Sequence, residues 1–334
     1  MSRASFVELL NSRPWLLADG ATGTNYFQMG LTSGDAPEMW NFDHADRVRS
    51  LHQRFIAAGA DIVLTNSFGG NRYRLKLHDL QDKVREVNIA AARNARAEAD
   101  AVARPVIVAG SVGPTGEIMQ PVGALSHADA VAAFAEQAAA LKEGGADVIW
   151  IETMSSKEEL EAAVEGAATC GLPVVTTMSF DTNGRTMMGI TPQGFGEITT
   201  HLVVQPAAIG ANCGTGAAEL IATVLGITQA RPDAVVVAKG NCGIPQYVDG
   251  HIHYSGTPEL MADYARIALD SGARIIGGCC GTSPEHLAAM RQSLEAYSGG
   301  ARPSIDEVEA RLGGVSDLAK GKSPTGAPRE RRRR

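Results

Sequence analysis

The segment Glu143-Gly144-Gly145-Ala146-Asp147-Val148-Ile149-Trp150-Ile151-Glu152 contains the two signals that decide the fold. Its glycines indicate a C-cap that ends a helix, and the apolar residues after Asp147 indicate a strand. The same junction recurs at Ala57-Ala58-Gly59-Ala60-Asp61 and at Asp270-Ser271-Gly272-Ala273-Arg274. We therefore expect a chain that alternates helices with buried strands, as α/β proteins do.

Outward from these junctions, short runs rich in Val, Ile and Leu recur along the chain, each closed by Gly, Pro, Asn or Asp. Strands that are apolar almost throughout belong in a parallel sheet covered by helices. Alanine-rich and charged segments between the runs supply those helices, and Thr257-Pro258-Glu259 and Ser283-Pro284-Glu285 mark two helix starts. The eight predicted strands are Trp15–Asp19, Asp61–Phe68, Pro105–Gly110, Asp147–Glu152, Pro173–Phe180, Ala207–Cys213, Ala234–Asn241 and Arg274–Cys280.

Eight strand–helix units predict a (β/α)8 TIM barrel, and 334 residues suit the ~250 residues plus insertions of such a barrel. The main alternative, an open doubly wound sheet, usually carries a GxGxxG phosphate loop after its first strand. Asp19-Gly20-Ala21-Thr22-Gly23-Thr24 lacks that pattern, which favours the barrel. We expect one barrel domain over residues 1–298 and a mostly disordered tail over 299–334. This tail carries a short helix around Ile305–Leu312 and is disordered from about Gly313.

Composition restricts the partners of the protein. The net charge is −7 and the one dense basic run is Arg331–Arg334, so we expect no nucleic-acid partner and assign the run no role. Every apolar stretch is interrupted before the ~18 residues of a membrane span, and Glu8 and Arg13 interrupt any signal core near the N-terminus. We therefore expect a cytoplasmic protein without a membrane partner.

The five cysteines are an odd set in a long chain, which argues against a disulfide framework. Cys213 closes the sixth predicted strand, Cys242 follows the seventh, and Cys279 and Cys280 close the eighth. Barrel enzymes carry their active sites at these strand ends. Sulfurs on strands ~4.8 Å apart can converge on one Zn²⁺ with bonds of ~2.3 Å. The alternative, a buried small hydrophobe at each position, is our preference for Cys170.

The neighbouring pair Cys279 and Cys280 is the least ordinary of these positions. Glycines on both sides allow the strand end to turn both side chains the same way. Three thiolates, with Cys213 as the third, leave one open zinc position and suit an incoming thiol held as thiolate, which predicts alkyl transfer to sulfur. If Cys242 also bound, the site would be closed and structural. A non-catalytic, zinc-stabilised barrel that only binds an amino acid is therefore the alternative.

Two carboxylates face the same end of the predicted barrel. Asp19 and Glu152 end the first and fourth strands, and an amino acid substrate needs an anion near its ammonium group. Asp19 could instead cap the turn that follows it, a common role of aspartate before glycine. Glu152 follows Val148-Ile149-Trp150-Ile151, where a carboxylate is costly unless the strand end opens onto a polar pocket.

Several motifs over about Leu16–Tyr297 carry a resemblance to a known family. They are Asp19-Gly20-Ala21-Thr22-Gly23-Thr24, Leu64-Thr65-Asn66-Ser67-Phe68-Gly69, Gly113-Pro114-Thr115-Gly116, Ile151-Glu152-Thr153, Gly210-Ala211-Asn212-Cys213 and Gly277-Gly278-Cys279-Cys280-Gly281-Thr282. With them the chain resembles the homocysteine S-methyltransferase family. This family includes betaine–homocysteine methyltransferases and the homocysteine-binding module of cobalamin-dependent methionine synthase.

The resemblance implies a (β/α)8 barrel that forms methionine from homocysteine, with Zn²⁺ as cofactor. Its zinc ligands match Cys213, Cys279 and Cys280, whereas Cys242 lies where relatives often have alanine. It also implies homocysteine contacts at Asp19 and Glu152. The predicted substrate-binding residues are therefore Asp19, Gly20 and Glu152.

The methyl donor is where this chain departs from part of the family. A betaine site needs an aromatic cage, and animal relatives carry tyrosines where this chain has Gly69 and Thr153. This favours a methylated corrinoid on a separate protein, because we find no cobalamin or folate module. Glycine betaine is the runner-up, with a cage built from other aromatic residues. The long arm by which animal betaine enzymes assemble is also missing, which leaves a homo-oligomer open. The candidate cage residues are Trp40, Tyr73, Phe68 and Tyr26.

Overall fold

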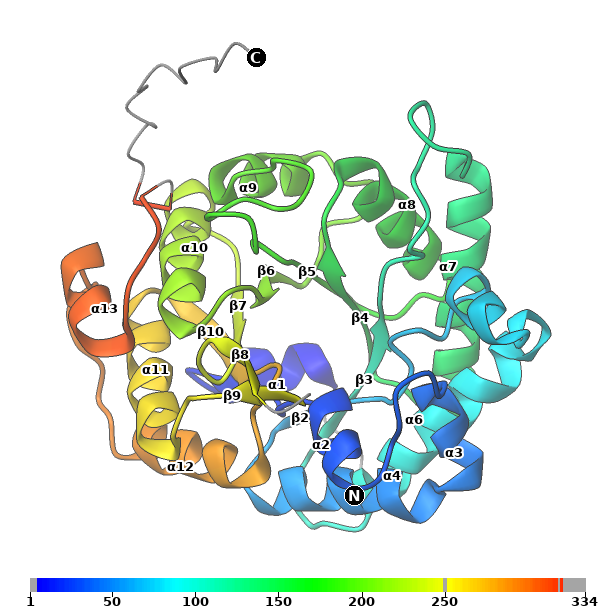
Figure 1. Cartoon of the computed structure of the whole chain (residues 1–334), viewed down its shortest axis with the longest axis horizontal. Coiled ribbons are helices and arrows are strands. Elements are labelled where there is room, and N and C mark those ends of the chain that lie inside the picture. Colours follow the sequence, from blue (N-terminus) through cyan, green and yellow to red (C-terminus); the bar gives the residue numbers. More distant parts are fainter. Residues whose placement is uncertain (1–4, 249–250, 318, 321–334) are drawn as a thin grey trace, which may run out of the picture.

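The structure is a computed structural model that describes residues 5–248, 251–317 and 319–320. Eight parallel strands form a barrel ringed by helices (Figure 1). Their order is β1-β10-β7-β6-β5-β4-β3-β2, and a parallel bridge between Ala18 and Ile62 joins β1 to β2. The predicted single-domain (β/α)8 TIM barrel is confirmed. The strands are β1 (Leu16–Leu17), β2 (Ile62–Leu64), β3 (Ile107–Val112), β4 (Val148–Met154), β5 (Val174–Met178), β6 (Ala208–Cys213), β7 (Val236–Gly240) and β10 (Ala273–Gly278).

One long helix follows each strand and covers the outside of the barrel. These helices are α4 (Ala45–Ala57), α6 (Val84–Asp100), α7 (His127–Gly144), α8 (Lys157–Ala168), α9 (Pro192–Thr200), α10 (Ala217–Ala230), α11 (Pro258–Asp270) and α12 (Pro284–Glu295). The predicted glycine stops are present, since Gly59, Gly145 and Gly272 have φ of 105°, 106° and 96°. Thr257 caps α11 by accepting a hydrogen bond from Leu260 N.

Shorter helices and a hairpin lie in the loops that follow the strands. The helices are α2 (Gly23–Gln28), η1 (Pro37–Met39), α3 (Trp40–Asp43), α5 (Arg72–Leu75), η2 (Lys76–His78) and η3 (Gln81–Lys83). The hairpin pairs β8 (Pro245–Val248) with β9 (His251–Tyr254) and follows β7. In the described part of the chain, no helix is both long and apolar enough to span a membrane.

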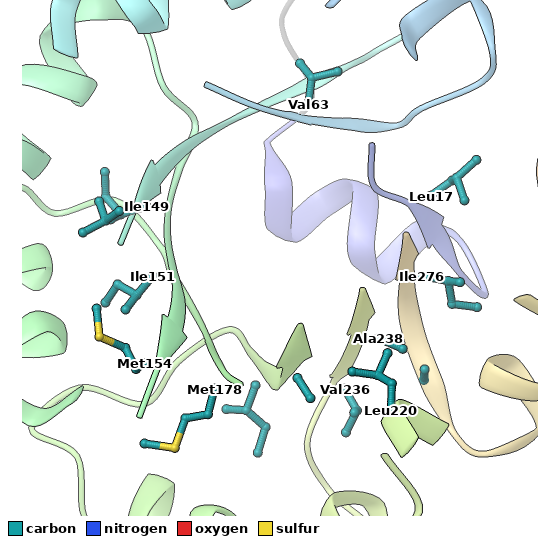
Figure 2. Close-up of a cluster of buried hydrophobic side chains, with 14 of the residues drawn as sticks. Leu17, Val63, Ile149, Ile151, Met154, Met178, Leu220, Val236, Ala238 and Ile276 are labelled. Atoms are coloured by element: carbon teal, nitrogen blue, oxygen red, sulfur yellow. The ribbon is translucent and has the colours of Figure 1, made fainter. Parts of the chain in front are cut away.

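Two layers of apolar side chains hold the barrel together. The outer layer lies between strands and helices, and Figure 2 shows Leu17, Val63 and Ile276 on that side of the strands. The inner layer fills the barrel with inward-facing residues such as Trp150 and Val237. Since a packed interior leaves no pore, substrates can reach polar groups only at the strand ends.

Helix α1 (Phe6–Ser12), which was not predicted from the sequence, closes the N-terminal end of the barrel. Phe6, Leu9 and Leu10 pack into the inner layer. The helix begins with a capping box, in which Ser5 and Glu8 bond to one another's backbone amides. This Ser-x-x-Glu spacing is a helix-start signal that was readable in the sequence.

Helix α13 (Ile305–Leu312) is the short helix expected beyond the barrel. Residues 313–320 were expected to be disordered, but they make tertiary contacts as far as they are described. Val315 is buried, and Ser316 N donates to Glu219 Oε1 at 2.7 Å. Lys320 Nζ pairs with Glu309 Oε1 at 2.8 Å. The rest of the predicted disordered tail, residues 321–334 with the arginine run, lies outside the described residues.

Candidate active site

Three cysteines meet at the C-terminal end of the barrel. Cys213 is the last residue of β6, and Cys279 and Cys280 directly follow β10. The sulfur of Cys213 lies 3.4 Å from that of Cys279 and 3.7 Å from that of Cys280. All three sulfurs lie within 4.8 Å of one another, and all three residues are partly exposed. The structure thus brings together the three predicted metal ligands.

Backbone geometry explains how neighbouring cysteines share one side. The strand ends at Gly278, and Gly281 follows the pair with a φ of 79°. A Cβ at Gly281 would lie 2.4 Å from the Cβ of Tyr254, so glycine is also needed for packing against β9. Cys213 itself has a φ of 61°, in the left-handed region that residues other than glycine rarely adopt. The backbone therefore leaves the regular strand conformation at the cysteines, which allows neighbouring side chains to face the same side.

Crowding of the three thiols separates their proton affinities. Contact with the Cys279 and Cys280 thiols raises the pKa of Cys213, and burial adds to this effect. Contact with the Cys213 and Cys279 thiols lowers the pKa of Cys280. Without a cation, the cluster therefore favours one thiolate that is hydrogen-bonded by its protonated neighbours.

The other two cysteines lie outside this cluster. Cys242 is fully buried and packs against Gly256, where an added Cβ would lie 2.7 Å from the Cys242 sulfur. Burial raises the pKa of its thiol to about 11. Within the described residues, the metal-capable group does not include Cys242. Cys170 lies at the buried end of α8, as expected for a small core residue.

Glu152 lies on β4 at the same end of the barrel. It is 8% exposed, and its Oε1 accepts a hydrogen bond from the Ser111 hydroxyl on β3. Burial raises its pKa to about 7, while the nearby Lys239 acts in the opposite direction. No hydrogen bond to Oε2 is formed among the described residues. The carboxylate thus has an oxygen to offer to a cation.

Asp19 has less to offer, because both of its carboxylate oxygens are engaged. Lys239 Nζ donates to Oδ1 at 2.7 Å, and Leu64 N donates to Oδ2 at 2.7 Å. Lys239 Nζ also lies 3.2 Å from the Asp19 carbonyl oxygen. Burial alone would lower the pKa of Lys239, but Asp19 and Glu152 outweigh it and raise that pKa. The pair is therefore a buried ion pair between β1 and β7.

Comparison with known proteins agrees with this geometry. The family model for homocysteine S-methyltransferase matches residues 16–294. The chain belongs to the homocysteine S-methyltransferase family. Methionine synthase of Mycobacterium leprae (strain TN) is 30% identical in an alignment of 308 residues that covers 86% of this chain and 25% of that protein. Methionine synthase of Mycobacterium tuberculosis (strain ATCC 25618 / H37Rv) is 31% identical in an alignment of 292 residues that covers 81% of this chain and 24% of that protein.

The chain thus spans about a quarter of the length of these curated relatives. Among solved structures, the homocysteine methyltransferase MmuM from Escherichia coli shares the fold. Its oxidized form aligns with a TM-score of 0.69 at 24% identity, covering 85% of this chain and 97% of MmuM. Its metallated form gives the same TM-score at 23% identity, covering 85% and 98%.

Gly20 is the remaining predicted substrate-binding residue. It lies where no side chain fits. A Cβ there would lie 2.6 Å from the Thr282 carbonyl oxygen and 2.8 Å from the Phe55 ring. The loop after β1 therefore packs closely against the loop after β10. Gly20 keeps Asp19 beside the cysteine loop, whether or not its own backbone contacts a substrate.

Of the four aromatic residues suggested as a cage, two are buried in the core. Trp40 is 5% exposed, and its ring contacts Tyr26 at a centroid distance of 5.4 Å. The Arg47 guanidinium lies 5.2 Å from the centroid of the same ring. Tyr26 is fully buried, whereas Phe68 is exposed and Tyr73 is half-buried. A cage around Trp40 would therefore have to displace Arg47.

Two polar residues of the site, Lys239 and Asn212, were not predicted from the sequence. Lys239 was counted as part of an apolar strand, although a lysine within Val235-Val236-Val237-Ala238-Lys239-Gly240 is a signal of a paired buried charge. Asn212 was quoted only as the neighbour of Cys213. Its side chain is fully buried and bonds to groups on β4 and β5.

Proposed function

We propose that this chain is a zinc-dependent homocysteine S-methyltransferase that forms methionine. The observation that carries the proposal is the convergence of Cys213, Cys279 and Cys280 beside the partly satisfied carboxylate of Glu152. The names of the relatives support it, since two are methionine synthases and one is a homocysteine methyltransferase with a metallated form.

The donor set fits a zinc ion. Zinc–sulfur bonds of ~2.3 Å at tetrahedral angles place two sulfurs about 3.8 Å apart. The sulfur–sulfur distances of 3.4 and 3.7 Å in the cluster are close to that value. Bound by Cys213, Cys279 and Cys280, zinc would supply the positive charge that keeps a fourth thiol, that of the substrate, deprotonated at neutral pH.

The chain's own charges position the amino acid. Asp19, Glu152 and Lys239 sum to one negative charge when all are ionised, which matches one substrate ammonium group. We assign the direct contact to Glu152 Oε2, because both oxygens of Asp19 are engaged. The ammonium group would in turn favour the ionised form of Glu152. Asp19 and Gly20 act by holding Lys239 and the loop after β1.

For the methyl donor we propose a methyl-corrinoid carried by a partner protein. Gly69 and Thr153 supply no aromatic wall, and the Trp40 ring is covered by Arg47. A quaternary ammonium donor needs such walls for cation–π contact. Attack by a thiolate on a cobalt-bound methyl group needs only access and alignment. Glycine betaine is the second candidate, with Phe68 as its exposed ring.

The test is methionine formation by the purified, zinc-loaded chain with homocysteine and each donor in turn. We expect methionine from methylcobalamin, used as a probe of the corrinoid chemistry, and little from glycine betaine. Rapid formation from betaine alone would overturn the choice of donor and keep the zinc–thiolate proposal. If homocysteine does not bind to the zinc-loaded chain, the proposed function itself is wrong.

A further inference from the structure

The strongest unassigned feature of the barrel mouth is the side chain of Asn212 on β6. It is fully buried and makes four polar contacts. Its Oδ1 accepts hydrogen bonds from Thr153 N at 2.9 Å and from Thr177 Oγ1 at 2.6 Å. Its Nδ2 donates to Thr153 Oγ1 at 2.8 Å and lies 3.9 Å from Cys279 Sγ. One amide thus links β4, β5 and the loop after β10.

The orientation of this amide follows from its partners. The backbone N–H of Thr153 can only donate, so the atom that faces it must be the Asn212 carbonyl oxygen. The NH2 group must then face Thr153 Oγ1 and the Cys279 sulfur, both of which can accept. Leucine, the closest apolar residue in size, would leave the part-buried Thr153 N–H without this partner.

The main partner, Thr153, has an unusual backbone. Its φ is 63°, in the left-handed region that a β-branched residue adopts only when its surroundings enforce it. The register between β4 and β5 shifts between Ile151 and Met154, so the strand bulges at Glu152 and Thr153. Bulges of this kind re-aim a side chain next to an active site. Here the residue that is re-aimed is Glu152.

We propose that Asn212 is a positioning residue that holds Thr153 in its left-handed conformation and thereby aims Glu152 at the substrate. The two hydrogen bonds to Thr153, one to its backbone and one to its hydroxyl, specify that conformation. Asn212 also precedes Cys213, so the same side chain fixes Glu152 relative to the cysteine cluster. This role rests on the proposed function, because Glu152 is the group assigned to the homocysteine ammonium.

Glycine at position 153 offers a test, because glycine adopts a positive φ without strain and needs less enforcement. We compare homocysteine binding by calorimetry in the zinc-loaded wild type, N212A, T153G and the double variant. We expect N212A to weaken binding by about tenfold or more. T153G should stay within about threefold of the wild type. N212A should cost less than about threefold in the T153G background.

Equal losses in both backgrounds would overturn the proposal, because the effect of Asn212 would then not pass through Thr153. Zinc content, measured on the same samples, should stay at that of the wild type in N212A. Loss of zinc would show that Asn212 acts on the thiols instead. Asn88→Ala is the matched control, because Asn88 is also fully buried but bonds to Gly70 O and Val84 O at the base of α6. It should lower the unfolding temperature without changing homocysteine affinity.

A crystal structure of N212A separates this inference from the proposed function. We expect φ of Thr153 to become negative and the Glu152 carboxylate to turn away from Ser111. An unchanged positive φ at Thr153 would overturn the positioning role, even if homocysteine is the substrate. Failure of the wild type to bind homocysteine, with the backbone change present in N212A, would instead remove the proposed function and leave the control of Thr153 standing.

Discussion

The two ends of the barrel each bury a charged cluster, but the clusters are balanced in opposite ways. At the N-terminal end, Asp61 is 1% exposed and faces three arginines. Its Oδ1 lies 2.6 Å from Arg13 and 3.7 Å from Arg104, and its Oδ2 lies 3.1 Å from Arg291. Leu17 N donates to the same Oδ2 at 3.0 Å. Every oxygen of this carboxylate is satisfied, and cations are in excess.

At the C-terminal end the excess is negative. Among the described residues, Asp19 and Glu152 share one cation, Lys239, and the ion pair uses Asp19 only. Glu152 is left with one hydrogen bond, from Ser111. A buried carboxylate that lacks partners is costly unless a cation arrives. The N-terminal cluster, whose carboxylate oxygens are all satisfied, therefore supports the fold, whereas the incomplete C-terminal cluster can accept a positively charged ligand.

The largest effect is expected at the C-terminal end of the barrel, on replacing a cysteine of the cluster. Cys279→Ser replaces a thiolate with a poorer zinc ligand, so zinc content should fall well below one ion per chain and methionine formation should become undetectable. Metal analysis of the purified protein and the methionine assay measure both effects. Cys242→Ala is the matched control and should retain zinc and activity, because Cys242 lies outside the cluster. Full zinc occupancy in Cys279→Ser would remove Cys279 from the site.

Removing the Asp61 carboxylate at the N-terminal end of the barrel should lower stability and leave the site intact. Asp61→Ala leaves three guanidinium groups without their carboxylate. Because the arginines are partly exposed, we expect a loss of about 3 kcal/mol in the free energy of unfolding, measured by urea denaturation. Homocysteine affinity should not change. As the control, Glu295→Ala removes an exposed partner of Arg291 and should cost less than about 0.5 kcal/mol. Equal costs would show that the cluster does not support the fold.

The sequence predicted the features of the barrel ends that depend on local patterns and missed those that depend on long-range pairing. Strand ends, glycine stops and the positions of Cys213, Cys279 and Cys280 follow local rules, because parallel strands bring their C-terminal ends to one side. The ion pair between Lys239 and Asp19 joins residues 220 positions apart, and no local pattern indicates which acid receives the lysine. For this reason Asp19 was expected to be as available to a substrate as Glu152.

Packing accounts for the other differences from the expectations. Trp40 was a candidate cage residue because aromatic residues on loops can line a site. Nothing in the sequence shows that Arg47, one helix later, covers its ring. The enforcement of a left-handed Thr153 by Asn212 is equally hidden, since it depends on three strands meeting in register. Capping at Ser5 and Glu8 was readable, and α1 could have been predicted from it.

A smaller effect is expected on removing the charge of the Glu152 carboxylate. Glu152→Gln keeps the shape of the side chain and removes the charge that we assign to the substrate ammonium. Homocysteine affinity should fall by about tenfold or more, as expected for a charged hydrogen bond of about 1.5–3 kcal/mol. Calorimetric titration measures this change. The free energy of unfolding should not fall, because burial disfavours the charge that is removed.

Glu159→Gln is the control for the Glu152 variant. Glu159 is also a buried carboxylate, but its Oε1 already accepts hydrogen bonds from Thr115 N and Thr115 Oγ1. Its replacement should leave homocysteine affinity unchanged. An affinity that is the same in Glu152→Gln as in the wild type would assign the ammonium group to another residue.

The smallest effect concerns His52 on α4, a buried ionisable group that belongs to neither end. Its Nε2 has no hydrogen-bond partner among the described residues, and burial lowers its pKa to about 4 from an ordinary value of 6.5. Between these values the unfolded chain binds a proton that the folded chain does not, so stability falls as the pH drops below 6.5. Relative to His52→Leu, the wild type should lose about 1.4 kcal/mol of unfolding free energy between pH 8 and pH 5.5. Urea denaturation at both pH values measures the difference. An identical pH dependence in His52→Leu and the wild type would mean that His52 is hydrated or paired in solution.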